Sequence, residues 1–270
     1  MTLNYLPHEF LVNGKPSELN SVGRISGVTL PMGTSKTRPI VEDKLRIPAL
    51  KNALARPRLI DLLKRVEAQA GVTVLCGRAG TGKTLLAAEF CAKHGDPRWY
   101  SIEPADTDWE TFSTYLTASI FGKAALDDIR GQHAAGPIDR TGIAEFLALC
   151  MERLHGEATG AGRLIVLDNM HHLYDAEWFP DFFNQLILSL APNVHVLMLC
   201  RTKPQLPLWR LRSKQMLNVI DESVLAVTAS ETVRLCRLRG LRGDLATQAH
   251  SISSGRISTL VESLRQISTF

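Results

Sequence analysis

The sequence predicts an α/β fold, a three-layer sandwich around a mainly parallel sheet, followed by a small helical subdomain. Three observations lead to it. A glycine-rich stretch, Gly77–Thr84, lies between a short apolar run and a run of helix formers. A second apolar run, Arg163–Asp168, ends in an aspartate. From Val224 onward the pattern changes to short amphipathic helices. Buried strands that alternate with helices are typical of parallel α/β sheets.

Composition places the chain among ordinary globular proteins. It has 270 residues, of which 45% are hydrophobic and 21% charged, enough for one large or two small domains. The net charge of +4 is too small to indicate a nucleic-acid partner by itself. The five cysteines form no CxxC pair, so neither a zinc site nor a disulfide framework is indicated, and we expect reduced, buried thiols. No segment near Met1 resembles a signal peptide and no apolar run could cross a bilayer, so a cytoplasmic location without membrane contact is expected.

The first part of the chain differs from the rest. Residues 1–45 are rich in Gly, Pro, Ser, Thr and Asn, and they predict a flexible N-terminal arm. Within it, Pro31–Pro39 is typical of a linker, and Phe10–Val12 is a short strand or docking segment. The next element is a helix from Ile47 to about Glu67, with leucines at helical spacing.

The stretch Gly77–Thr84 fits G-x-x-x-x-G-K-[ST], the phosphate-binding loop also called Walker A. Glycines give the loop little bulk and positive-φ freedom, so that backbone N–H groups can surround a phosphate. Lys83 can reach the β- and γ-phosphates, and the Thr84 hydroxyl can ligate Mg²⁺. The apolar run Val72–Cys76 predicts a buried strand before the loop, and Leu85–Lys93 predicts a helix after it. The predicted phosphate-contacting residues are Gly77, Arg78, Ala79, Gly80, Thr81, Gly82, Lys83, Thr84 and Leu85.

Elements after the loop alternate in the same way. Arg98–Ile102 predicts a second strand, and Thr107 with Glu110 predicts a capping box for the helix that follows. The apolar residues of that helix are expected to pack in the core. A polar, Gly-rich stretch from Gly131 to about Thr141 predicts a loop, and the helical spacing from Ile143 to Leu154 predicts another amphipathic helix.

The stretch Arg163–Asp168 predicts a buried parallel strand with an acid at its carboxyl end. Ligands bind at that edge of open α/β sheets. Asp168 is therefore placed to hold Mg²⁺ directly or through water. An apolar run followed by aspartate is common by itself, and its position downstream of a phosphate loop makes it informative.

A further strand is predicted at Val194–Cys200, after a helix with Pro180 at its first position. Arg201 leaves this strand beside Asp168, where it could meet the phosphates or remain a solvated strand-end residue. Met216–Ile220 is a candidate fifth strand.

The C-terminal part is predicted to be helical. Thr228–Glu231 is a capping box, and Ala246–Ile252 and Ile257–Ile267 predict two short helices. The predicted domains are therefore an arm at 1–45, a nucleotide-binding domain at 46–221 and a helical subdomain at 222–270.

Several stretches in a fixed order carry a closer resemblance. They are Arg56–Leu63, Trp99–Ile102, Asp106–Leu116, Leu164–Leu173, Cys200–Thr202, Pro207–Arg212, Leu225–Glu231 and Gly255–Leu260. Over residues 50–268, this series resembles the nucleotide-binding module of the MalT-like, LuxR-type transcriptional regulators, which are STAND-class P-loop NTPases.

The resemblance implies a switch between ATP and ADP forms, with Mg²⁺ as cofactor. ADP would hold the protein closed, and inducer with ATP would open it for oligomerisation or for a protein partner. It also implies that Asp168 is the acid of the second nucleotide motif, that Arg201 is a γ-phosphate sensor, and that Arg56 and Arg58 flank the adenine. Lys83, Asp168, Asn169 and Arg201 would then form the reacting centre.

Three departures from the family pattern limit these implications. The family's second acid is replaced by Asn169, whose amide cannot accept a proton, so slow or negligible ATP hydrolysis is expected. The family's Gly-x-Pro contact is replaced by Gly255-Arg256-Ile257. No DNA-binding pattern is recognised in residues 222–270, so DNA binding is not carried over.

Two other function classes stay open. One is an AAA+-like ATPase that acts on DNA or protein assemblies, which predicts robust turnover and a trans-acting arginine. The other is a transcriptional regulator that contacts nucleic acid directly through the basic stretch from Arg201 to Arg242, although the near-neutral charge of the chain disfavours it.

Overall fold

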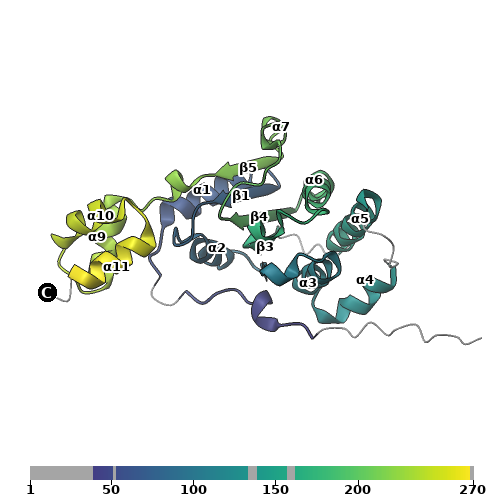
Figure 1. Ribbon diagram of the computed structural model, residues 1–270, viewed down its shortest axis with the longest axis horizontal. Coiled ribbons are helices and arrows are strands. Elements are labelled where there is room, and N and C mark those ends of the chain that lie inside the picture. The colour runs from purple at the N-terminus through teal and green to yellow at the C-terminus, as the bar shows by residue number, and fades with distance from the viewer. Residues whose placement is uncertain (1–38, 51–52, 133–138, 157–161, 268–270) are drawn as a thin grey trace, which may run out of the picture. The chain divides into compact units, whose positions relative to one another are not determined.

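The computed structural model describes residues 39–50, 53–132, 139–156 and 162–267 (Figure 1). Ile40–Phe270 forms one compact unit. The predicted linker Pro31–Pro39 and the segment Phe10–Val12 lie almost entirely outside the described residues. The domain boundaries at 45 and 221 stay predictions.

The sheet confirms the predicted fold class. Five strands, all parallel, lie in the order β2-β3-β4-β1-β5, with β1 in the interior between β4 and β5. The apolar runs predicted as strands within the described residues form strands, because β-branched and aliphatic side chains fit a sheet that is buried on both faces. The strands are β1 (Val72–Cys76), β2 (Arg98–Ser101), β3 (Arg163–Asp168), β4 (Val194–Cys200) and β5 (Leu217–Ile220).

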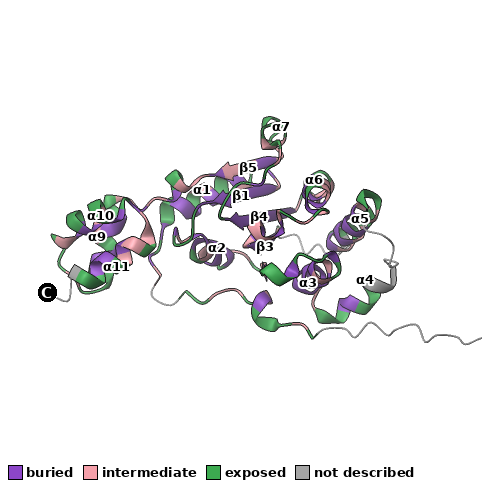
Figure 2. Ribbon diagram, in the orientation of Figure 1, coloured by how far each residue is buried: buried purple, intermediate pink, exposed green. Residues whose placement is uncertain are grey.

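Helices cover both faces of this sheet, so the domain has three layers. Side chains of α1 and α2 pack on one face, and side chains of α3, α5 and α6 pack on the other. Figure 2 shows the strands between these layers as mostly buried, with some intermediate residues, as in β5. The helices are α1 (Pro57–Glu67), α2 (Lys83–Cys91), α3 (Trp109–Phe121), α4 (Leu126–Gln132), α5 (Arg140–Gly156), α6 (Phe179–Ser189), α7 (Leu208–Ser213), α8 (Glu222–Leu225), α9 (Ala229–Leu238), α10 (Leu245–Ser253) and α11 (Ile257–Ile267), with 3-10 turns η1 (Glu42–Leu45), η2 (Pro104–Asp106), η3 (Lys123–Ala125) and η4 (Met170–Leu173).

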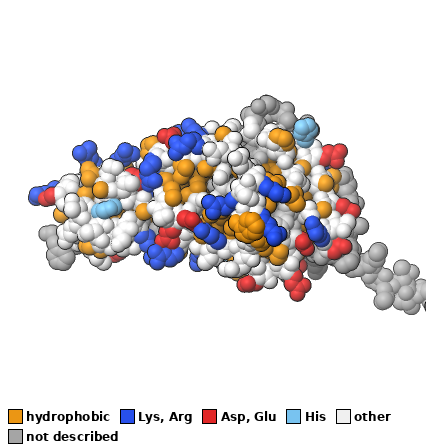
Figure 3. All heavy atoms as spheres, turned by 90° about the horizontal axis from the view of Figure 1, so that it is seen from above, with side chains coloured by type: hydrophobic (Ala, Val, Ile, Leu, Met, Phe, Trp, Pro, Cys, Tyr) orange, Lys and Arg blue, Asp and Glu red, His pale blue; other side chains and the backbone are white. Residues whose placement is uncertain are grey.

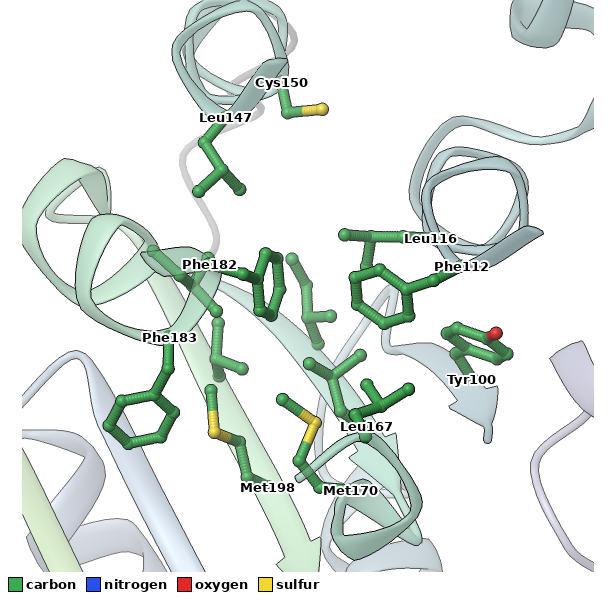
Figure 4. Packing of buried hydrophobic residues seen from close by; sticks show 14 of the residues in the cluster. Tyr100, Phe112, Leu116, Leu147, Cys150, Leu167, Met170, Phe182, Phe183 and Met198 are labelled. Atoms are coloured by element: carbon green, nitrogen blue, oxygen red, sulfur yellow. The ribbon is translucent and has the colours of Figure 1, made fainter. Parts of the chain in front are cut away.

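The larger core cluster is rich in aromatic side chains. Phe112 of α3 and Phe182 of α6 meet edge to face with ring centroids 4.9 Å apart. Tyr100 of β2 stacks on Tyr115 of α3 at 5.5 Å. Figure 4 shows side chains from these helices and from α5 converging on those of β2, β3 and β4. Such pairs add to the free energy of burial and hold the helices against the sheet.

A third cluster joins α9, α10 and α11 into the predicted C-terminal helical part. It includes Leu235, Cys236, Ala249, Leu260 and Leu264, all buried. Leu54, from the segment before α1, packs into the same cluster. The capping box of Thr228 and Glu231 at the start of α9 is confirmed, with both reciprocal bonds present.

Three local predictions are wrong in detail. The first helix starts at Pro57 rather than near Ile47, because proline favours the first helical position and disfavours a helical residue before it. The N-cap of α3 is Asp108, whose carboxylate accepts from the Thr111 N–H at 3.0 Å, instead of Thr107 in a capping box with Glu110. Pro180 occupies the second position of α6, which begins at Phe179. None of the described helices is long and apolar enough to span a membrane.

Candidate functional site

The phosphate loop lies at the carboxyl edge of the sheet, between β1 and α2. Gly80 and Gly82 have φ values of 79° and 84°, a region that favours glycine. The Gly77 N–H donates to the carbonyl of Cys200 at 3.1 Å, which fixes the start of the loop against the end of β4. The sequence pattern therefore folds locally as it predicts, with a strand, a glycine turn and a helix in succession.

Lys83 begins α2 and folds back over the loop. Its ammonium donates to the carbonyl oxygens of Gly77 and Arg78, the latter at 3.0 Å, and to Thr81 Oγ1 at 3.3 Å. Burial lowers the pKa of Lys83, and the nearby Asp168 carboxylate opposes that shift. A buried cation whose hydrogen bonds within the described residues go to neutral oxygens is well prepared to exchange those contacts for a phosphate.

The two predicted Mg²⁺ ligands lie in contact. Thr84 Oγ1 donates to Asp168 Oδ2 at 3.0 Å, and the Asn169 N–H donates to Asp168 Oδ1 at 2.8 Å. Burial raises the pKa of Asp168, and the bonds from Thr84 and Asn169 oppose that shift. A hydroxyl beside a carboxylate fits Mg²⁺, which uses few protein oxygens and takes the rest from water and phosphate. Across the described ranges, no group of three or more His, Cys, Asp or Glu side chains could hold a metal by itself.

Asn169 and Arg201 lie on the same edge as Asp168. Asn169 has a left-handed backbone with φ of 60°, which asparagine tolerates better than most residues. Arg201 follows β4, the direct neighbour of β3, and is exposed. The positive charge of Arg201 is near enough to Lys83 to contribute to lowering its pKa. The strand order thus brings together the four residues predicted for the reacting centre.

His171 is a residue of this edge that sequence reasoning did not single out. Neither of its ring nitrogens finds a hydrogen-bond partner within the part of the chain that the structure describes. Burial, with the positive charges of Arg201 and Lys83, lowers the pKa of His171 to about 4. A neutral imidazole with free nitrogens three positions after Asp168 could hydrogen-bond a bound water or phosphate. The only signal in the sequence is its place in the run after the strand.

The C-terminal helices contact the phosphate loop directly. The Ser258 N–H donates to the Gly80 carbonyl at 3.0 Å. The Arg256 guanidinium donates to the Ala79 carbonyl through Nε at 3.1 Å. At the outer side of the loop, Arg78 pairs with Glu222 at 2.8 Å. The turn before α11 therefore lies over the tip of the loop.

Arg56 and Arg58, predicted to flank an adenine, also reach the helical part. Arg56 Nη2 pairs with Glu231 Oε2 at 3.1 Å, with both side chains buried. Arg58 donates to the carbonyls of Val224 and Ala226, both at 3.1 Å. The structure thus gives both guanidiniums protein partners beside the site.

A narrow pocket adjoins the loop between α2 and α11. Its walls are mostly apolar and come from the segment before α1, from α2 and from α11, but its volume of about 20 Å³ is too small to hold a nucleobase. The lining residues are Ala53, Leu54, Arg56, Gly82, Leu85, Leu86, Glu89 and Ile257. Leu85, predicted as a contact residue, lies in this wall.

Comparisons with known proteins agree with this geometry. A family model described as an AAA domain matches residues 66–203, just over half of the chain. The HTH-type transcriptional regulator MalT of Vibrio cholerae is 27% identical over 215 residues, which cover 78% of this chain and 23% of the regulator. MalT of Yersinia enterocolitica is 28% identical over 205 residues, 74% of this chain and 22% of that protein. The chain therefore spans about a quarter of the length of these relatives.

A solved structure shares the fold. It is a STAND protein (Signal Transduction ATPase with Numerous Domains) with a tetratricopeptide repeat sensor from Pyrococcus horikoshii. The TM-score is 0.54 at 20% identity, and the match covers 83% of this chain and 31% of that one.

Proposed function

The chain belongs to the AAA-domain family of P-loop NTPases, distantly related to the NTPase region of MalT and to a STAND protein, and from this premise we propose that it is an ATP/ADP-dependent switch. An AAA P-loop domain implies nucleotide binding, typically with Mg²⁺. In the proposed switch, the bound nucleotide sets whether the C-terminal helices stay on the phosphate loop. A protein partner or a second copy of the chain then reads that state.

One observation carries this proposal. The C-terminal helical part contacts the backbone of the phosphate loop, through Ser258 to Gly80 and Arg256 to Ala79. A phosphate in the loop therefore lies next to groups from both parts of the unit. Any difference in how ADP and ATP fit there becomes a difference in the free energy of closure.

Arg201 is the proposed means of telling the two nucleotides apart. Arg201 directly follows β4, at the edge of the sheet where β3 ends in Asp168, and its side chain is exposed. It would gain a charge-assisted hydrogen bond only when a γ-phosphate is present. Arg201→Ala should therefore weaken binding of ATP more than binding of ADP, and an equal loss for both nucleotides contradicts this role.

Hydrolysis is proposed to be slow. Asn169 occupies the position after Asp168, and a neutral amide can orient water without accepting its proton. A switch benefits from this, because slow turnover leaves time for the ATP form to be read. Fast turnover that depends on Asn169 would contradict the proposal.

The test is to denature the purified protein and identify the nucleotide that it releases. The proposal expects ADP in near-stoichiometric amount, and little or none from Lys83→Ala. Arg265→Ala is a matched control, because it removes a cation from the exposed side of α11. A wild-type preparation that carries no nucleotide and binds none when it is added contradicts the proposal.

A second candidate function is nucleic-acid binding, which rests on α7. No residue of this helix is buried, and Trp209 is 67% exposed with the Arg210 guanidinium 5.2 Å from its ring. Figure 3 shows Lys and Arg side chains interspersed with hydrophobic ones on the face viewed from above. Aromatic and cationic side chains together can stack bases and pair with phosphates. DNA binding that falls steeply with salt, and whose affinity Trp209→Ala reduces, supports this function. No binding at low salt excludes it.

A further inference from the structure

Two cysteines face each other at the base of the phosphate loop. Cys76 is the last residue of β1, and Cys200 is the last residue of β4. The parallel register pairs them directly. Cys76 precedes Gly77, the first residue of the loop, and Cys200 precedes Arg201. Any change at this pair is therefore transmitted to two elements of the candidate site.

The geometry brings the two thiols together. Residues paired across neighbouring strands point to the same face of the sheet, and the strands are about 4.8 Å apart. This spacing lies within the Cα separations that disulfides span, about 4.4–6.8 Å. The Cys76 thiol donates to the Arg201 carbonyl and the Cys200 thiol donates to the Leu75 carbonyl, both at 3.8 Å, and both side chains lie in the same buried cluster. Cys76 is 8% exposed and Cys200 is 1% exposed, so the sulfur next to the loop is the more accessible one.

We propose that Cys76 and Cys200 form a reversible disulfide on exposure to hydrogen peroxide, and that this bond weakens nucleotide binding at the adjacent loop. The bond itself is independent of the proposed function, whereas its effect on nucleotide rests on that function.

The chemistry assigns different roles to the two sulfurs. The neighbouring Cys200 thiol lowers the pKa of Cys76 against the effect of burial, and the ammonium groups of Lys203 and Lys83 act in the same direction as Cys200. The neighbouring Cys76 side chain, together with burial, raises the pKa of Cys200. Because the thiolate is the nucleophile, Cys76 is the sulfur that attacks peroxide.

The reaction balances in two steps. The Cys76 thiolate attacks one peroxide oxygen, the O–O bond breaks, and the departing hydroxide takes up a proton to leave as water, which gives a sulfenic acid. The Cys200 sulfur then attacks the sulfenic sulfur, the S–O bond breaks, and the hydroxide leaves as water with the Cys200 proton. The two thiols have then lost two electrons, which reduce one peroxide to two waters. Two equivalents of a thiol reductant return those electrons.

The other cysteines provide built-in controls. Cys91, Cys150 and Cys236 lie on separate helices, α2, α5 and α9. Burial raises the pKa of Cys91 and of Cys150 to about 12, so few thiolates form there. Selective oxidation of the strand pair is therefore expected.

The bond would disturb the loop. A disulfide needs Cβ atoms about 3.5–4.5 Å apart, less than the usual distance between strands, so the ends of β1 and β4 must draw together. Gly77 and Arg201 follow directly and must move with them. The resulting strain also makes the bond easy to reduce, as suits a reversible device. We expect about a tenfold loss of ADP affinity on oxidation.

The first arm of the experiment tests the bond. The full wild-type chain is treated with hydrogen peroxide, digested without reductant and analysed by mass spectrometry. The expected result is a crosslinked peptide pair that contains Cys76 and Cys200 and separates on reduction. Cys150→Ser should retain the crosslink, and in Cys200→Ser a sulfenic-acid probe should label Cys76. Oxidised protein that lacks this crosslink, or carries it between other cysteines, overturns the proposal.

The second arm measures ADP affinity before oxidation, after it and after reduction. The expected result is a loss that reductant reverses and that Cys200→Ala abolishes. Unchanged affinity in fully crosslinked protein overturns the regulatory part. Reduced wild-type protein that binds no ADP refutes the proposed function, and with it the effect on nucleotide, while the first arm still decides whether the bond forms.

Discussion

The buried ion pair between Arg56 and Glu231 should contribute strongly to holding the sheet domain and the C-terminal helices together. Arg56 is 3% exposed and Glu231 is 5% exposed. Glu231→Gln keeps the size of the side chain but leaves the Arg56 charge without its buried counter-charge. Removing one partner of a buried pair costs about 3–5 kcal/mol. Because Gln retains an oxygen that can accept from Arg56, we expect about 3 kcal/mol, a large part of the 5–15 kcal/mol typical of a domain.

Urea unfolding, followed by circular dichroism, measures this cost. The midpoint should fall with little change in slope. Glu262→Gln is the matched control, since its pair with Arg265 is exposed and should contribute about 0.5 kcal/mol or less. Replacing Arg56 and Glu231 together with methionine should restore much of the loss, because no uncompensated charge remains. A Glu231→Gln cost below about 1 kcal/mol would refute the reasoning.

The same pair gives a pH dependence with a definite sign. Burial alone would raise the pKa of Glu231, but the Arg56 guanidinium and the Thr228 N–H hold it below its usual value of 4.5. A lowered carboxyl pKa stabilises the fold above the unfolded value and loses that effect as the pH falls through the folded one. The stability difference between wild type and Glu231→Gln should therefore be full above about pH 4.5 and shrink below it.

Three further predictions concern the loop, the far edge of the sheet and turnover. Gly80→Ala should destabilise the fold more than Gly240→Ala, as measured by urea midpoints. Both residues have positive φ, but the new Cβ at Gly80 would lie 2.2 Å from a side-chain oxygen of α11, whereas Gly240 has open space. Equal losses of stability for the two variants would contradict this contact. The hydrogen bond with Glu67 raises the pKa of His94 above 6.5. The stability lost in His94→Gln should therefore be about 1 kcal/mol near pH 6 and should fade as the pH rises through the folded pKa. A stability loss that is constant with pH would contradict this. Asn169→Asp should raise ATP turnover roughly tenfold or more in a phosphate-release assay, and no increase argues against Asn169 as the cause of slow hydrolysis.

Most of the fold follows from local sequence pattern. The apolar runs at Val72–Cys76, Arg163–Asp168 and Val194–Cys200 become strands because a sheet covered on both faces requires such residues. Helix starts were harder to place, since adjacent polar residues compete for one cap. Asp108 displaces Thr107 because its carboxylate accepts both the N–H and the hydroxyl of the following Thr111.

Long-range pairings were beyond the local pattern. Arg56 and Glu231 are separated by 175 positions, and nothing near either residue indicates that they meet. Cys76 and Cys200 meet because β4 lies between β1 and β3, an order that no local pattern shows. The sequence located the phosphate loop and Asp168 because both rest on short patterns tied to strand ends. The contacts of Arg256 and Ser258 with the loop depend on where the helical part packs.

The most direct test of the central claim is a calorimetric titration of nucleotide-free protein with ADP and Mg²⁺. The account predicts one site per chain with a dissociation constant in the micromolar range or tighter, about −8 kcal/mol. It also predicts that Lys83→Ala weakens binding at least tenfold, because the buried Lys83 ammonium is the cation proposed to bind the phosphates. No binding by the wild-type chain, or equal affinity in Lys83→Ala, would contradict it.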